Sequence, residues 1–267
     1  MKDIRQLQTH LEEKRKESFF YSWELIRKYS QDELDSAEIL HLIVTAVFEP
    51  AGEECGTTYD EEKGCTHIFR NADGKVRISS RQVLSFNVKD SCGVGATQTS
   101  ELFLDLKRIP TRKDVAETIG GQTVVAAGLG RSLADSGMTG FALGRVGSAT
   151  KGPRQSETSK SWSQLLINSA PIPVSAQTRS GVNYLDRDRQ GVYRWTFGHV
   201  LGLNLLSELF VDRVAWDGSD VFRTREHFGV RRGVLRPFAP RLITQRFYAA
   251  LKRASARGFR VEVTLFR

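Results

Sequence analysis

The sequence predicts an α/β (α+β) protein of two related lobes, each containing a strand-helix-strand repeat, after an N-terminal helical segment. Three observations favour this class. A chain of 267 residues can form one large domain or two small ones. A hydrophobic content of 40% with 26% charged residues is typical of folded globular proteins. Finally, two segments of the chain align without a gap at an offset of 118 residues.

The aligned segments are 124–145 and 242–263. Their matched positions are Val124-Val125 with Leu242-Ile243, Leu129 with Phe247, Leu133 with Leu251, Gly140-Phe141 with Gly258-Phe259, and Leu143 with Val261. In each segment a short β run leads into apolar positions four apart, then a glycine, then an alternating pattern. Each segment is therefore predicted to form a strand, a helix and a strand.

Four regions follow from this alignment and from composition. We expect N-terminal helices over 1–37, a first α/β lobe with a cysteine cluster and a hairpin over 38–146, a linker over 147–161, and a second, Arg-rich α/β lobe over 162–267. Phe19, Phe20 and Trp23 have helical spacing, and Ser30 with Glu33 matches a capping box that begins a short helix. The linker is predicted from its low hydrophobicity.

Within the first lobe the pattern predicts several short elements. The apolar run 39–48 predicts a buried strand, and 67–70 with 75–79 predict a hairpin around the turn Asn71-Ala72-Asp73-Gly74. Residues 101–106 are expected to form a strand. A helix is predicted over 112–119, ended by Gly120-Gly121.

Three cysteines and one histidine form a partial metal-ligand set: Cys55, Cys65, His67 and Cys92. Thiolate and imidazole are the ligand types of closed tetrahedral zinc sites, and Cys65 and His67 share one face of a predicted strand. The spacing lacks a C-x-x-C knuckle. Bound zinc and buried free thiols therefore both stay open. An odd number of cysteines favours a reducing compartment.

The formal charge of +8 is concentrated in the last third of the chain. Residues 179–267 carry 16 Arg and one Lys against eight acidic residues, a net of +9. The densest basic cluster is Arg223, Arg225, Arg231, Arg232 and Arg236, with Phe222 and Phe228 interleaved. Guanidinium groups beside aromatic rings suit phosphates and bases, or the carboxylates of a protein partner. A solvated basic face without a partner is the alternative.

The sequence shows no complete catalytic signature, so we assign no catalytic residue, and enzymatic activity is left open as the less favoured reading. Gly128-Leu129-Gly130 lacks the third glycine of a dinucleotide fingerprint. His199 and Ser207 have no G-x-S-x-G elbow and no assignable carboxylate. The acid pairs Asp186/Asp188 and Asp217/Asp220 lie in polar sequence, without the apolar setting that raises a catalytic pKa.

A family resemblance rests on the cysteine region. Glu54-Cys55-Gly56-Thr57-x-Tyr59-Asp60, then Cys65, then Cys92-Gly93-x-Gly95, followed by LFLDLKRIPTRKDVAETIGG, resembles a group of uncharacterised bacterial proteins. These are similar in layout to the double C-x-x-C-G motif proteins, some of which act as immunity proteins against polymorphic toxins. The resemblance covers roughly residues 38–146, and it implies a family-type zinc site.

By resemblance we expect a non-enzymatic binding protein, an immunity protein that holds a cognate toxin. The alternative from the residues is a nucleic-acid-binding protein that uses the Arg-rich lobe. An enzyme with an unrecognised site is the third reading. The longest apolar run, 39–48, falls short of a membrane span, and the start has no secretory pattern, so we expect a cytoplasmic protein.

Overall fold

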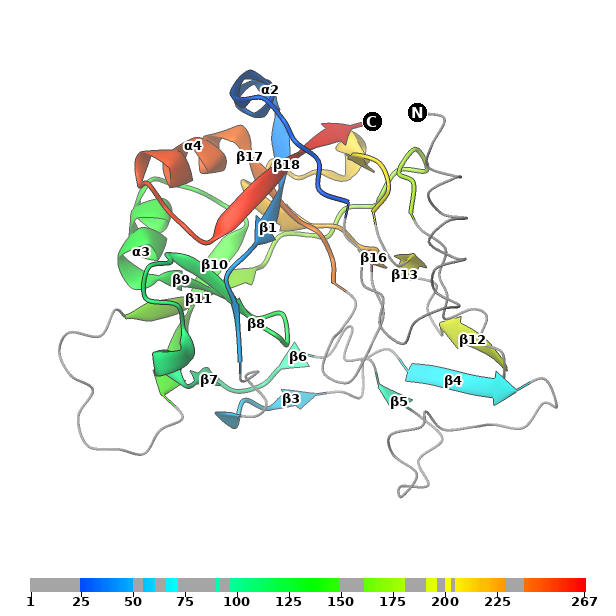
Figure 1. The fold of residues 1–267 in the computed structure, drawn as a ribbon, viewed down its shortest axis with the longest axis horizontal. Coiled ribbons are helices and arrows are strands. Elements are labelled where there is room, and N and C mark those ends of the chain that lie inside the picture. The colour runs from blue at the N-terminus through cyan, green and yellow to red at the C-terminus, as the bar shows by residue number, and fades with distance from the viewer. Residues whose placement is uncertain are drawn as a thin grey trace.

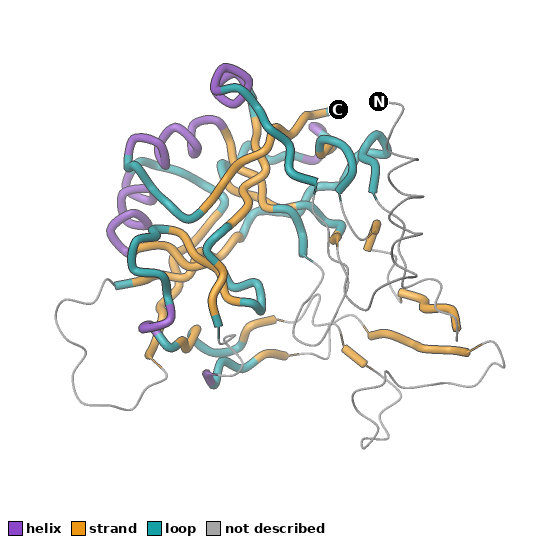
Figure 2. The backbone as a smooth tube through the Cα atoms, viewed as in Figure 1, coloured by secondary structure: helices purple, strands orange, loops and turns teal. Residues whose placement is uncertain are grey.

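The structure is a computed structural model. Backbone and side chains are described for residues 25–49, 55–59, 97–148, 161–180, 205–228 and 238–267, and backbone alone for residues 60, 66–71, 90–91, 191–195 and 200–202. Strands dominate these ranges (Figure 2). The α-helices within them are α2 (Gln31–Ser36), α3 (Ala127–Asp135) and α4 (Gln245–Arg253). The predicted capping box is confirmed, because the Ser30 hydroxyl and the Glu33 carboxylate each accept the other's backbone N–H at the start of α2.

A five-stranded sheet has the order β14-β18-β1-β17-β15. Its strands are β14 (Leu209–Val211), β18 (Phe259–Phe266), β1 (Ile39–Val44), β17 (Arg241–Thr244) and β15 (Val221–Arg223). The central strand β1 pairs antiparallel with both β17 and β18, so these two strands run parallel to each other.

A six-stranded sheet has the order β2-β8-β9-β11-β10-β7. Its strands are β2 (Val47–Phe48), β8 (Val115–Thr118), β9 (Thr123–Ala126), β11 (Trp162–Ile167), β10 (Phe141–Ser148) and β7 (Leu102–Leu104). Here β11 pairs antiparallel with both β9 and β10, as β1 does in the other sheet.

The two sheets exchange their central strands. The segments β9-α3-β10 and β17-α4-β18 have the same lengths, and all their bounds differ by 118 residues. The strand between β9 and β10 is β11, which lies later in the chain, whereas the strand between β17 and β18 is β1, from near its beginning (Figure 1). Each sheet therefore contains strands from both halves of the chain.

Several hydrogen bonds and helix caps occur once in each half of the chain, at equivalent positions. The Thr57 hydroxyl accepts the backbone N–H of Phe103 at 2.9 Å, and the Thr178 hydroxyl accepts that of Phe210 at 2.9 Å. Asp105 and Asp212 each cap a 3-10 turn, η2 (Leu106–Arg108) and η4 (Arg213–Ala215). These contacts lie within each half, whereas the strand exchange joins the halves reciprocally, because β1 pairs with β17 and β18 while the equivalent β11 pairs with β9 and β10. Such reciprocity is that of an isologous interface, so the halves are related by an approximate two-fold axis.

The predicted fold class is wrong. The described chain is mostly β, with two large sheets and short helices, and it is not an α/β protein of two lobes built on strand-helix-strand repeats. The exchanged antiparallel strands explain this, because they fill the place that a directly paired parallel strand would take in an α/β sheet. The helix predicted over 112–119 is also wrong. Val115 and Ala116 instead pair with Val125 and Val124 in the β8–β9 ladder.

Alternation along the strands separates two apolar layers of the five-stranded sheet. Leu40 and Ile243 pack with Leu133 of α3 and Phe247 of α4, which lie at the same side of the molecule in Figure 1. Ile39 and Leu242 instead belong to a second cluster with Phe222 and Phe228. The Phe141 and Phe247 rings meet edge to face at 5.9 Å and join the two halves.

Smaller ladders complete the described structure. They are β3 (Tyr59–Asp60) with β6 (Thr97–Gln98), β13 (Val200–Gly202) with β16 (His227–Phe228), and β4 (Thr66–Asn71) with β5 (Asp90–Ser91) and β12 (Gly191–Trp195). The first strand of the predicted hairpin corresponds to β4, and its second strand lies outside the described residues. None of the helices found in the described ranges is both long and apolar enough to cross a membrane.

Candidate functional site

A cleft of about 660 Å³ lies where the two sheets meet. Residues 41–44 of β1 and the equivalent residues 164–167 of β11 both line it, together with the turn 118–123 and parts of β15, β17 and β18. Because equivalent positions of both halves line the same space, the cleft lies at the approximate two-fold axis. Its volume is that of a typical ligand pocket.

One ion pair joins the two sheets beside this cleft. Arg241 of β17 donates two hydrogen bonds to the Glu117 carboxylate of β8, at 2.9 and 2.7 Å, and a third to the Gly121 carbonyl at 3.0 Å. Both side chains are only 16% exposed. A bidentate pair with this geometry fixes the distance between the sheets and leaves Arg241 neutralised.

Arg223 takes the position of Glu117 in the other half. Arg223 lies opposite Arg241 in the β15–β17 ladder, just as Glu117 lies opposite Thr123 in the β8–β9 ladder. Its side chain is exposed and lines the cleft. Among the described residues no carboxylate forms an ion pair with it. Among the residues that the structure describes, Arg223 is therefore the guanidinium group of the cleft whose charge no direct contact neutralises.

A buried carboxylate with two arginines forms another part of the wall. Glu262, 4% exposed, accepts a hydrogen bond from Arg27 at 2.9 Å and forms a longer one with Arg260 at 3.4 Å. Arg27 also donates to the Leu205 carbonyl at 3.0 Å. Of the charged residues described, four arginines and two glutamates line the cleft, which gives it an excess of positive charge.

His41 is the neutral member of this wall. Burial, and to a smaller extent the nearby charges of Arg241, Arg260 and Arg27, lower its pKa to about 3. Its Nδ1 atom is buried and has no hydrogen-bond partner within the described ranges. His41 therefore adds no positive charge near neutral pH.

This depressed pKa makes a testable contribution to stability. Because the folded pKa lies below the ordinary value of 6.5, the contribution is complete above pH 6.5 and is lost as the pH falls towards 3. Between pH 7 and pH 5 we expect the free energy of unfolding of the parent protein to fall by about 2 kcal/mol more than that of His41→Gln. Glutamine is a suitable replacement, since the equivalent residue is the buried Gln164. Urea unfolding at both pH values measures this, and parallel pH dependences of the two proteins would contradict it.

An exposed aromatic ring lies in the same cleft. Phe238 is 47% exposed, although its backbone is held by two hydrogen bonds with Phe228, at 2.8 and 2.9 Å. The rings of Phe222 and Phe228, which the sequence suggested as stacking partners of the basic cluster, are instead completely buried in the core. Phe238 is thus an exposed ring of the cleft that can contact a ligand.

The predicted basic cluster is only partly described. Arg223 lines the cleft, whereas Arg225 forms an exposed ion pair with Glu226 at 3.0 Å and is not among the lining residues. Arg231, Arg232 and Arg236 lie outside the described residues. The structure therefore separates two neighbouring arginines, one paired and one unpaired, that the sequence grouped together.

The predicted zinc ligands are mostly not described. Cys55 has a free thiol and is partly buried. His67 lies in β4, where only the backbone is described, and Cys65 and Cys92 lie outside the described residues. In the described ranges no group of three or more His, Cys, Asp or Glu residues could hold a metal ion. Zinc binding stays a prediction.

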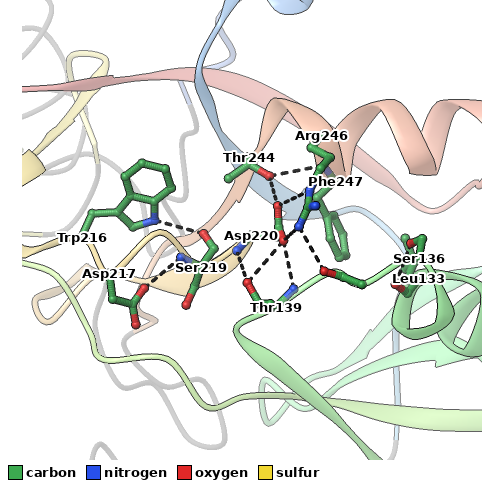
Figure 3. A network of polar contacts seen from close by, with 11 residues as sticks. Leu133, Ser136, Thr139, Trp216, Asp217, Ser219, Asp220, Thr244, Arg246 and Phe247 are labelled. Atoms are coloured by element: carbon green, nitrogen blue, oxygen red, sulfur yellow. Dashed lines mark hydrogen bonds and ion pairs between the residues drawn. The ribbon is translucent and has the colours of Figure 1, made fainter.

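The structure describes some of the acidic, serine and histidine residues to which the sequence assigned no catalytic role. Asp220 is 3% exposed and binds Arg246, Thr244 and Thr139 (Figure 3), so its carboxylate joins the two halves of the chain. The Ser207 hydroxyl accepts the Arg179 N–H at 2.9 Å and donates to the Glu208 carbonyl. Asp186, Asp188 and His199 lie outside the described residues.

No protein-family model and no curated protein matches this chain. The resemblance to the double C-x-x-C-G proteins therefore stays a prediction.

Sequence reasoning missed most of the cleft. Arg241, Arg260 and Phe238 were not singled out, and neither were Arg27 and His41. One available signal was the sequence likeness of Glu101-Leu102-Phe103 to Glu208-Leu209-Phe210, at an offset of 107 residues. This likeness indicates that the two halves also correspond in the region N-terminal to the aligned segments, where Glu117 and Arg223 lie at equivalent positions.

Proposed function

We propose that this protein binds nucleic acid in the cleft between its two sheets. The observation that carries the proposal is Arg223, which lines the cleft opposite Arg241 and lacks an acidic partner among the described residues. Guanidinium groups bind phosphates, as they bind carboxylates, in a planar, bidentate geometry. A formal charge of +8 for the whole chain supports a polyanionic partner.

The position of Arg223 opposite Arg241 places two like charges in one ladder, and an anionic ligand would offset their repulsion. Like charges directly opposite each other in a ladder destabilise it, and the equivalent place in the other half holds the pair Glu117 and Thr123. Glu117 neutralises Arg241 across the sheets, but the described part of the chain contains no counterpart of this carboxylate for Arg223. A bound phosphate beside Arg223 would supply the missing negative charge.

A toxin partner, bound zinc and a cytoplasmic location remain proposals with less support than nucleic-acid binding. A toxin partner and zinc are implied by the resemblance alone, and no contact among the described residues favours either. A cytoplasmic location remains our expectation from the sequence. Binding of an acidic protein by the same cleft is a distinct outcome of the experiment below.

Two neighbouring arginines provide the test. In fluorescence anisotropy with a labelled oligonucleotide, Arg223→Ala should weaken binding about tenfold and reduce the slope of log affinity against log salt by about one, the loss of one phosphate contact. Arg225→Ala removes an equally charged, exposed side chain that is paired with Glu226, so we expect less than about a twofold change. Equal effects of the two substitutions, or no binding at low salt, would refute the proposal.

A further inference from the structure

Phe238 is exposed but rigidly placed. Its backbone exchanges two hydrogen bonds with Phe228, and two residues later the Pro240 carbonyl accepts the N–H of Thr224 at 3.1 Å. The next residue, Arg241, lies opposite Arg223. Residues 223–228 and 238–241 are thus held against each other along their length, with Arg223 and Phe238 both lining the cleft.

We infer that the ligand of the cleft is single-stranded, with a base stacked on the Phe238 ring and a neighbouring phosphate at Arg223. This inference rests on the proposed function and adds the class of nucleic acid. An aromatic ring on a fixed backbone can stack on any base, because every base has a π face. In a duplex those faces are covered by the neighbouring base pairs.

The size of the cleft supports the same conclusion. The ion pair between Glu117 and Arg241, with a shortest N–O distance of 2.7 Å, joins the two sheets beside the cleft. The volume of the cleft is about 660 Å³. That volume is typical of pockets for small ligands. A duplex, whose major groove alone is about 12 Å wide, is far larger. Splayed nucleotides of a single strand would fit between the walls.

The composition of the walls fits a strand with two chemically different sides. Arg223 offers charge on one wall, whereas Gln98 and Gln164 lie on the other and hydrogen-bond to each other at 2.7 and 3.0 Å. These two amides satisfy each other, so their wall is polar but uncharged, whereas the Arg223 guanidinium group can pair with a phosphate. An acidic peptide would use Arg223 but would have no need of an exposed ring.

The experiment compares Phe238→Ala, Phe238→Trp and Arg223→Ala in the full chain. Each is titrated against a labelled single-stranded oligonucleotide, its duplex and polyglutamate, with thermal unfolding as the folding control. We expect Phe238→Ala to weaken single-strand binding roughly 5- to 150-fold, the loss of one stacked base, without changing the salt slope. Phe238→Trp should retain the affinity. Duplex binding should be weaker and should not respond to Phe238→Ala.

The outcomes separate this inference from the proposed function. If single strand and duplex bind equally and Phe238→Ala changes neither, while Arg223→Ala still weakens both, the single-strand inference is overturned and nucleic-acid binding stands. If neither nucleic acid binds at low salt, both proposals fail. Tighter binding of polyglutamate than of either nucleic acid would identify an acidic protein partner and also overturn both.

Discussion

Gly258→Ala should destabilise the protein by about 4 kcal/mol, a large share of the stability of a typical domain. A Cβ atom at this position would lie 2.0 Å from the Val115 carbonyl oxygen, and the backbone φ of +111° is one that side-chain-bearing residues rarely adopt. The backbone cannot move away freely, since the Gly258 carbonyl accepts the N–H groups of Thr45 and Ala46 at 2.8 and 3.3 Å. Strain and overpacking therefore add to each other.

Gly140→Ala should destabilise the protein by a similar amount to Gly258→Ala. Its Cβ would lie 2.1 Å from the Val221 carbonyl oxygen at a φ of +86°, and its own carbonyl accepts the Asn168 N–H at 3.1 Å. Gly218→Ala is the matched control, because Gly218 has the same φ but no atom within 4 Å of the added Cβ. It should cost only about 1 kcal/mol. Urea unfolding would contradict this explanation if all three variants lost the same stability.

Asp220→Ala should cost about 3 kcal/mol. The buried carboxylate accepts the Thr139 N–H at 2.9 Å, the Thr244 hydroxyl at 2.7 Å and the Arg246 Nε at 3.0 Å (Figure 3). Removing it leaves these donors without their partner and Arg246 without its counter-ion. Thr139 belongs to the first half of the chain and Thr244 to the second, so the loss also weakens the contact between them.

Asp217→Ala provides the comparison. Asp217 is exposed and accepts the Ser219 N–H at 2.9 Å, so its removal should cost no more than about 1 kcal/mol. Chemical denaturation of both variants gives the two values. Similar losses for Asp217→Ala and Asp220→Ala would show that the Asp220 network does not hold the halves together.

Local features of the fold could be predicted from the sequence, and non-local ones could not. The capping box at Ser30 and the buried strand from Ile39 depend on neighbouring residues, and both occur in the structure. The exchange of β1 and β11 depends on which distant strand fills the gap between two parallel strands. No local pattern specifies that choice, so the strand-helix-strand segments alone predict an α/β fold, which the exchanged strands overturn.

The same limit applies to the cleft. The basic cluster around Arg223 could be recognised from composition, but the pairing of each arginine could not. Arg241 is neutralised by Glu117, which lies 124 residues away, while Arg225 is neutralised by its neighbour Glu226. Similarly, Phe222 and Phe228 looked like stacking residues, but both are buried in the core. Which charge is free and which ring is exposed are properties of the folded chain.

Mapping the bound strand tests the central claim most directly. A single-stranded oligonucleotide with a photoreactive base would be cross-linked to the intact protein, and the modified peptides would be identified by mass spectrometry. The cleft predicts cross-links at Phe238 and in the facing segment from Arg223 to Phe228, with strong reduction in Arg223→Ala. Cross-links confined to residues outside the cleft, or unchanged by Arg223→Ala, would contradict binding between the two sheets.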